Sequence, residues 1–399
     1  MRVGVTSGAA GGQAAFGAGD ESGEHRPAGQ LLRCARGRDG PSFGAEQDEE
    51  LTVAFHPELH DHRNDPRLRR PAHHVRLGGR VQPARGSAVR RRPARRAGWR
   101  RGWARSAFLA ASFWYFLARW PSPGPDRADA WHAYTRHRVA YLAAARHFRH
   151  HVEVLTAPIP GGRLVGYLHR PAGPPGSGAL ALVCGGIDVW KSDPAIDAIT
   201  TSLLARGISV VTIDIPGTGE SPVRAAAGRD HAFRALLDQL LTRRDIDAER
   251  LGAVGLSFGG HWATRLGLTD PRIRAVVNIA GPLHHAFQRD WLARLPPATL
   301  ASLANSLGLD TRHSEQVIST LQGMSLVAQG LLHQPHRPAF LVVNGARDEQ
   351  VPIADLHLLT EHGIAQDSLI FGTDRHCASY ATPLHRPFIA DWLAAHLGN

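Results

Sequence analysis

From residue 152 onward, short apolar runs alternate with segments in which apolar residues recur at helical spacing. The runs predict strands buried on both faces, and the periodic segments predict helices that bury one face. The predicted strands are 152–155, 163–169, 179–184, 209–213, 251–255, 275–280, 339–343 and 368–371. The predicted helices are 193–206, 229–243, 258–268, 353–361 and 385–396. This alternation indicates an α/β fold whose mostly parallel sheet has helices on both faces, with an antiparallel hairpin at residues 152–169.

One segment within this domain, residues 283–334, breaks the alternation. It places apolar residues at helical spacing between two predicted strands, at Trp291, Leu292, Leu295, Val317, Ile318, Leu321, Leu326, Val327 and Leu331. A helical insertion at this point is where a lid over a ligand site would sit. A plain packing insertion is the alternative.

Ahead of the alternating domain, which spans 151–399, residues 106–150 form a predicted helical lead-in. The apolar run 107–118 resembles the core of a signal peptide, but it lies far from Met1 and is too short to span a bilayer. We therefore expect a buried helix there and no transmembrane segment. Residues 126–149 predict a second, loosely amphipathic helix. Together the two are expected to pack on the main domain as a cap that can line the substrate pocket.

Composition sets residues 1–105 apart from the rest of the chain. The formal net charge of the chain is +11, and the arginine-rich first 105 residues carry nearly all of it. They show no sustained periodicity, so we expect disorder or a start site assigned too early. A basic arm for nucleic acid or anionic lipid, or a targeting segment, is the alternative; nucleic acid is not the expected partner. The 3 cysteines are too few for a disulfide framework or a zinc site, which favours a cytoplasmic protein without metal or cofactor.

The candidate nucleophile lies at the end of the run 251–255. Gly255-Leu256-Ser257-Phe258-Gly259 stands between this predicted strand and the helix 258–268. A serine between two glycines at such a turn is the nucleophile elbow of the α/β-hydrolase fold. The turn is tight, and glycine at 255 and 259 removes side chains that would clash. The sequence therefore predicts Ser257 as a nucleophile.

A serine needs a base and a group that orients the base, and in this fold the acid and the histidine follow the serine in the chain. Asp348 and His376 each follow a predicted strand, so both are expected at the sheet edge that carries Ser257. The rival histidines are His261, His284 and His285. The rival acids are Glu349, Asp374 and Asp214, and we interpret Asp214 as a turn or supporting residue.

Donors for a developing oxyanion are expected from two backbone positions. One is the N–H of Phe258, directly after the nucleophile. The other is the N–H of Ile187 or Gly186, in the loop Gly185-Gly186-Ile187-Asp188 after the strand 179–184. The paired glycines allow this backbone to approach a ligand closely. Asp188 is a possible supporting residue.

Residues 130–399 resemble the α/β-hydrolases that include 2,6-dihydropseudooxynicotine hydrolase, fungal polyketide-shortening pigment hydrolases and the fermentation–respiration switch esterase. The shared marks are the loop 185–188, 214–219, the elbow 255–259, 344–348, the pair His376-Cys377 and the final helix with 391–393. The resemblance implies that Ser257, Asp348 and His376 form the triad and that the N-terminal helices serve as a cap. It covers both esterases and enzymes that cleave a carbon–carbon bond beside a ketone.

The expected function is a serine hydrolase that cleaves a small-molecule carbonyl substrate, a carboxylic ester or thioester, through an acyl-enzyme. Hydrolytic cleavage of a carbon–carbon bond beside a ketone is the alternative, with Asp188 or Asp193 as a possible extra proton donor. A non-catalytic binding protein of the same fold is a third reading. The sequence leaves a homodimer open.

Overall fold

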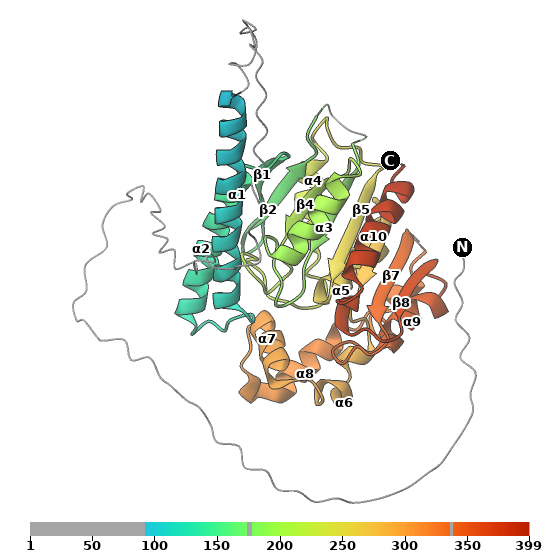
Figure 1. The fold of residues 1–399 in the computed structure, drawn as a ribbon. Coiled ribbons are helices and arrows are strands. Elements are labelled where there is room, and N and C mark those ends of the chain that lie inside the picture. The colour runs from blue at the N-terminus through green and yellow to red at the C-terminus, as the bar shows by residue number, and fades with distance from the viewer. Residues whose placement is uncertain (1–91, 174–177, 336–337, 399) are drawn as a thin grey trace, which may run out of the picture. The chain divides into compact units, whose positions relative to one another are not determined.

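A computed structural model describes residues 92–173, 178–335 and 338–398, with side chains from residue 101. Within these residues, eight strands form one sheet in the order β1-β2-β4-β3-β5-β6-β7-β8 (Figure 1). The strands are β1 (His151–Ile159), β2 (Gly162–Arg170), β3 (Leu180–Cys184), β4 (Ser209–Ile213), β5 (Leu251–Leu256), β6 (Ile273–Ile279), β7 (Ala339–Gly345) and β8 (Asp367–Phe371). The pairs β1–β2 and β2–β4 are antiparallel, and the remaining pairs are parallel. The predicted fold class and the hairpin at one edge are confirmed.

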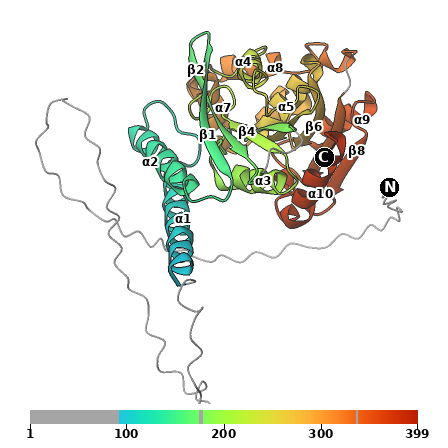
Figure 2. The same ribbon diagram turned by 90° about the horizontal axis from the view of Figure 1, so that it is seen from above.

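The sheet is covered on both faces, as its apolar strands require. All of β3 is buried, and so is β5 apart from its last residue. Helices α3 (Pro194–Leu204) and α10 (Thr382–His396) pack on one face, and α4 (His231–Leu240), α5 (Phe258–Thr269) and α9 (Ile353–Glu361) pack on the other. Figure 2 shows α3 and α10 on one side of the strands and α4 and α5 on the opposite side. Two separate hydrophobic cores result.

The insertion after β6 is helical, as predicted. Its elements are η2 (His285–Phe287), α6 (Arg289–Leu292), α7 (Pro297–Leu307), η3 (Thr311–His313), α8 (Ser314–Gly323) and η4 (Leu331–His333). They lie together beyond one end of the sheet (Figure 1). Helix α7 has proline in its first turn, where the missing N–H leaves no hydrogen bond unmade, and ends at Gly308 with a φ of 71°.

The helix pair α1 (Arg92–Arg119) and α2 (Ala128–Ala145) precedes the sheet, and α2 lies against the body of the domain. The predicted lead-in is therefore helical, although α1 begins before residue 106; residues 1–91 lie outside the described residues. The expectation that 107–118 is buried is wrong. Phe113, Trp114 and Leu117 are exposed, because α1 packs through one face only and presents the other to solvent. No helix among the described residues is both long and apolar enough to cross a membrane.

Candidate active site

Ser257 lies at the sharp turn between β5 and α5. Its backbone adopts φ 55° and ψ −128°, a conformation that L-residues rarely hold unless the surroundings enforce it. A Cβ at Gly255 would lie 2.1 Å from the carbonyl oxygen of Gly259, and one at Gly259 would lie 2.4 Å from the carbonyl oxygen of Gly185. Only glycine fits at these two positions. The turn leaves the Ser257 hydroxyl partly exposed above the sheet.

Three polar side chains meet at the ends of β5, β7 and β8. The Ser257 hydroxyl donates to Nε2 of His376, with 2.8 Å between Oγ and Nε2. Nδ1 of His376 donates to Oδ2 of Asp348 over 2.7 Å. These roles are assigned from the chemistry, because an ionised carboxylate can only accept. The three residues form a hydrogen-bonded series in the order required for nucleophilic attack by a serine.

Asp348 is held by several donors besides His376. Its Oδ1 accepts the backbone N–H groups of Gln350 and Val351, and its Oδ2 accepts from the side-chain amide of Asn344. Burial on its own would raise the pKa of Asp348, but the hydrogen bonds, that of His376 first, lower it below its usual range. The carboxylate therefore stays ionised and fixed in orientation.

His376 is only partly exposed, with 18% of its side chain accessible. Burial disfavours the charged imidazolium, yet the neighbouring Cys377 sulfur and the Asp348 carboxylate raise the pKa of His376 above its usual range. Cys377 itself has a φ of 61°. Oδ1 of Asn344 accepts its N–H over 3.0 Å, so Asn344 connects the loop of the histidine with the loop of the aspartate.

The rival residues from the sequence lie elsewhere. His261 is fully buried with Nδ1 3.0 Å from the carbonyl oxygen of Pro282, and burial lowers its pKa to about 3. His284 contacts Ser325 through its ring, and no hydrogen bond joins it or His285 to Ser257 among the described residues. Asp374 accepts backbone N–H groups of its own loop, and the exposed Glu349 pairs with Arg375. None of these residues belongs to the series of Ser257.

An apolar pocket opens beside Ser257 and encloses about 400 Å³ of empty space, part of it open to solvent. Its lining combines the elbow, the loop after β3 and the insertion: Ile187, Ser257, Phe258, Pro282, Ala286, Phe287, Leu292, Leu295, Thr299, Leu303, Gln350 and Val351. The insertion, through α6 and α7, thus supplies one wall. Residues 106–150 supply none of this lining, so the expectation that they line it is not met for this pocket.

The loop after β3 runs directly past the serine. A Cβ at Gly186 would lie 2.8 Å from Cβ of Ser257 and 3.1 Å from its Oγ. The N–H of Ile187 has no hydrogen-bond partner among the described residues. Phe258 opens α5, where the first N–H groups of a helix lack intrahelical partners. Two backbone donors are therefore available beside the hydroxyl of Ser257.

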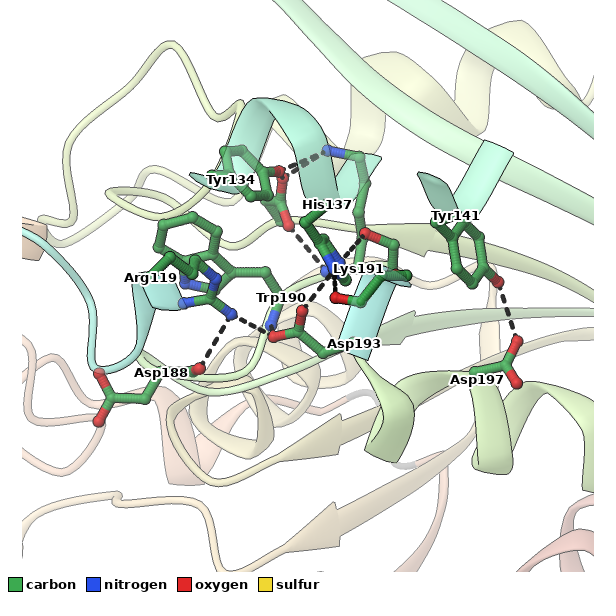
Figure 3. A network of polar contacts seen from close by, with 12 residues as sticks. Arg119, Tyr134, His137, Tyr141, Asp188, Trp190, Lys191, Asp193 and Asp197 are labelled. Carbon is green, nitrogen blue, oxygen red and sulfur yellow. Dashed lines mark hydrogen bonds and ion pairs between the residues drawn. The ribbon is translucent and has the colours of Figure 1, made fainter. Parts of the chain in front are cut away.

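Behind this loop lies a buried polar network that joins α1 and α2 to the domain (Figure 3). Arg119 pairs with Asp193, and Tyr141 donates to Asp197 over 2.9 Å. Asp214 accepts from Tyr134 and from Lys191, the single lysine of the chain. Lys191 is fully buried and also pairs with Glu220. Asp214 therefore connects α2 with the domain through Tyr134 and Lys191, and its role at the site stays a prediction.

The family of the chain follows from a match over most of its length. The sequence model of the family described as esterase FrsA-like matches residues 89–397. The chain belongs to this family. The match covers α1, α2, the sheet and the insertion, so the N-terminal helix pair belongs to the family's pattern.

The individual relatives of this FrsA-like chain have 30% sequence identity to it or less. Esterase FrsA of Yersinia pestis (strain Pestoides F) is 30% identical over 233 residues, which are 56% of each chain. The chain thus spans about half the length of the curated relatives it matches. Among solved structures, AbyA5 has a TM-score of 0.62 at 27% identity and covers 76% of this chain and 86% of its own. A 2,6-dihydroxy-pseudo-oxynicotine hydrolase has a TM-score of 0.63 at 23% identity, over 74% and 80%, and this likeness concerns the fold alone.

Prediction from the sequence did not identify the residues that support the site of this FrsA-like chain. Arg119 follows an apolar run and Asn344 stands in the motif 344–348, and neither position indicates the contacts that its side chain makes. Nothing in a single sequence connects Arg119 with Asp193, because 74 positions separate them. Asp188 was expected beside the site; its carboxylate accepts the N–H of Ser122 over 2.7 Å. The catalytic roles of Ser257, Asp348 and His376 stay predictions.

Proposed function

We propose that the chain is a serine esterase that hydrolyses carboxylic esters or thioesters with an apolar acyl group. The observation that carries this proposal is the hydrogen-bonded series Asp348–His376–Ser257 at the mouth of an apolar pocket. The names of the FrsA esterases and the family of the chain support the same class of reaction.

In the proposed acylation step, the oxygen of Ser257 attacks the carbonyl carbon while Nε2 of His376 takes the hydroxyl proton. The carbonyl electron pair moves onto oxygen, where the N–H groups of Phe258 and Ile187 stabilise the negative charge. When the tetrahedral intermediate collapses, the bond to the leaving alcohol or thiol breaks, and His376 returns the proton to it. Asp348 holds the imidazole in the required tautomer and stabilises its charged form.

Deacylation repeats these steps with water. His376 takes a proton from a water molecule whose oxygen attacks the acyl carbon, and the serine leaves with that proton. The free acid is the second product. The apolar lining of the pocket favours an acyl group without charge, since burying an unpaired charge among Leu292, Leu295 and Leu303 would be costly.

Hydrolysis of a carbon–carbon bond beside a ketone is the alternative within enzymes. It needs a donor that protonates the leaving carbanion or enol. Among the described residues that line the pocket, Thr299 and Gln350 are polar besides Ser257, and none carries a carboxyl group. Asp193, one of the two donors considered from the sequence, is buried in its pair with Arg119. The ester reading is therefore favoured.

A substrate panel tests the proposal. Purified protein is assayed on p-nitrophenyl esters of increasing acyl length, on acyl thioesters and on β-diketones, with Ser257→Ala as the matched control. We expect turnover of apolar esters or thioesters that the control lacks, and covalent labelling of Ser257 by a fluorophosphonate. Turnover of β-diketones alone would support carbon–carbon cleavage instead. Folded protein that is neither labelled nor active would favour a binding protein.

A further inference from the structure

The backbone that carries the N–H of Ile187 has no regular secondary structure to hold it. It belongs to the loop 185–193, which is neither helix nor strand, and begins with two glycines. Glycine at 185 is needed because a Cβ there would lie 2.0 Å from the carbonyl oxygen of Val189. A donor helps a transition state only when it is held in place before the charge develops. Side-chain contacts, from within the loop and from outside it, must therefore fix the peptide groups around Ile187.

Arg119 reaches this loop from the end of α1. Its guanidinium is fully buried, pairs with the equally buried Asp193, and donates to the carbonyl oxygen of Asp188 over 3.1 Å. It also lies 3.7 Å above the ring of Trp190. Figure 3 shows the guanidinium pointing at the carbonyl oxygen of Asp188 and at the carboxylate of Asp193, two residues of the same loop.

Trp190 and Asp193, which Arg119 contacts, in turn fix the position of Ile187. The ring nitrogen of Trp190 donates to the carbonyl oxygen of Ile187 over 2.8 Å. The backbone N–H of Trp190 donates to Asp193 over 2.6 Å. The carbonyls of residues 187 and 188 are thus both fixed, one through Trp190 and the other by Arg119 directly. These are the two peptide groups that follow the proposed oxyanion donor.

Stability alone is a weak reason for such a buried ion pair. Nε and one terminal nitrogen of Arg119 are buried without a hydrogen-bond partner among the described residues. An ion pair with buried donors that lack acceptors recovers little of the free-energy cost of its desolvation. Its geometry, in contrast, is specific, because a planar guanidinium contacts the carboxylate, the carbonyl and the indole together.

We propose that Arg119 is a positioning residue for the loop 185–193, here called the oxyanion loop. Through this contact, Arg119 couples the docking of the helix pair α1–α2 to catalysis at Ser257. This inference rests on the proposed esterase function. Arg119 touches neither the substrate nor Ser257. It acts through Trp190 and the carbonyl of Asp188 on the direction of the Ile187 N–H.

The test uses the full chain with Arg119→Lys, which keeps the charge and loses the planar fork. Tyr141→Phe is the matched control, because it removes a partly buried hydrogen bond of the same helix pair, to Asp197, away from the oxyanion loop. On the best p-nitrophenyl ester, we expect kcat of Arg119→Lys to fall about 10- to 100-fold with KM within about twofold, the effect of a misplaced oxyanion donor. The Ki for a trifluoromethyl ketone, which forms an oxyanion on the serine, should rise by the same factor.

Several results would overturn the inference. One is a folded Arg119→Lys variant with unchanged kcat and Ki, and another is a rise in KM at constant kcat. Equal losses in Arg119→Lys and Tyr141→Phe would reduce Arg119 to a structural role. If Arg119→Lys does not fold, Arg119→Met combined with Asp193→Asn leaves no buried charge unpaired, and the same measurements decide.

Failure of this inference is distinguishable from failure of the proposed function. Wild-type protein that turns over no ester and is not labelled at Ser257 contradicts the esterase proposal itself. Active wild-type protein with an equally active Arg119→Lys variant contradicts only the role of Arg119.

Discussion

In two places among the described residues, a serine, a histidine and an aspartate contact one another in series. In the first, His376 lies 2.8 Å from Ser257 and 2.7 Å from Asp348. In the second, Nδ1 of His137 lies 3.0 Å from Oγ of Ser112, and its Nε2 lies 3.1 Å from Asp193. By residue type and distance the two series are similar, but Nε2 of His137 also lies 2.9 Å from Oγ of Ser192, and Oδ1 of Asp193 has no hydrogen-bond partner among the described residues.

Their surroundings differ in every respect that matters for chemistry. Ser257 faces a pocket and adjoins the first N–H of α5, whereas Ser112 is buried inside the helical segment α1. Asp348 contacts one basic side chain, that of His376, whereas Asp193 contacts both His137 and Arg119. The first series lies at a pocket, whereas Ser112 and His137 are buried. Three features therefore distinguish a candidate active site from a structural network of the same residue types. They are a serine at a pocket, a strained turn at that serine, and a carboxylate that contacts only one basic side chain.

The largest expected difference lies between the removal of Ser257 and the removal of Ser112. Ser257→Ala should lower kcat for the best ester on the order of 10⁶-fold, because the nucleophile is lost, with little change in thermal stability. Ser112→Ala should leave kcat within about twofold and lower the free energy of unfolding by about 1 kcal/mol, because one buried hydrogen bond is lost. Steady-state kinetics and thermal melts measure both. A large loss of activity in Ser112→Ala would contradict the conclusion that the series of Ser112 is only structural.

The next effect concerns the carboxylates. Asp348→Asn should lower kcat by about 10⁴-fold, because an amide that donates to Nδ1 favours the wrong tautomer of His376. Asp374→Asn is the control in the same region, since this carboxylate accepts backbone N–H groups of Arg375 and Ala381. It should lower the melting temperature and change kcat less than about tenfold. Equal losses of kcat in both variants would contradict the assignment of the acid.

The smallest effect is a shift in pH dependence. His376 acts as a base only when neutral, and its pKa is raised, so kcat/KM should fall as the pH drops through that raised value. Cys377→Ser removes the sulfur that contributes to this rise. The acid limb should then move to lower pH, within about one unit. A pH–rate profile from 5 to 10 measures it, with wild type as reference, and a limb that moves to higher pH would show that the sign is wrong.

The elements of the sheet were predictable from the sequence because their signals are local. Runs such as 179–184 are apolar throughout, and Gly255 and Gly259 mark the elbow on their own. Helix α7 was harder to place, since Pro296-Pro297 resembles a break although Pro297 stands at the start of the helix. The sequence predicts a lid in residues 283–334, but the apolar positions named there include no residue of α7, so Thr299 and Leu303 of the pocket wall were not identified.

Tertiary contacts explain what the sequence did not predict. Phe113, Trp114 and Leu117 have the composition of a buried helix, and only the packing of α1 decides which face is covered. Arg119 and Asp193 lie far apart in the chain, and no spacing rule brings them together. The prediction of the candidate nucleophile needed one motif, whereas the residues that hold its oxyanion loop needed the fold.

Lys191 gives the molecule a built-in chemical reporter. It is the single lysine of the sequence and is fully buried beneath Tyr134 of α2, between Asp214 and Glu220. An amine-reactive reagent should therefore reach the amine of Lys191 only when α2 lifts away. The rate of modification at this one position, followed by mass spectrometry, measures how often the helix pair opens in the unaltered protein.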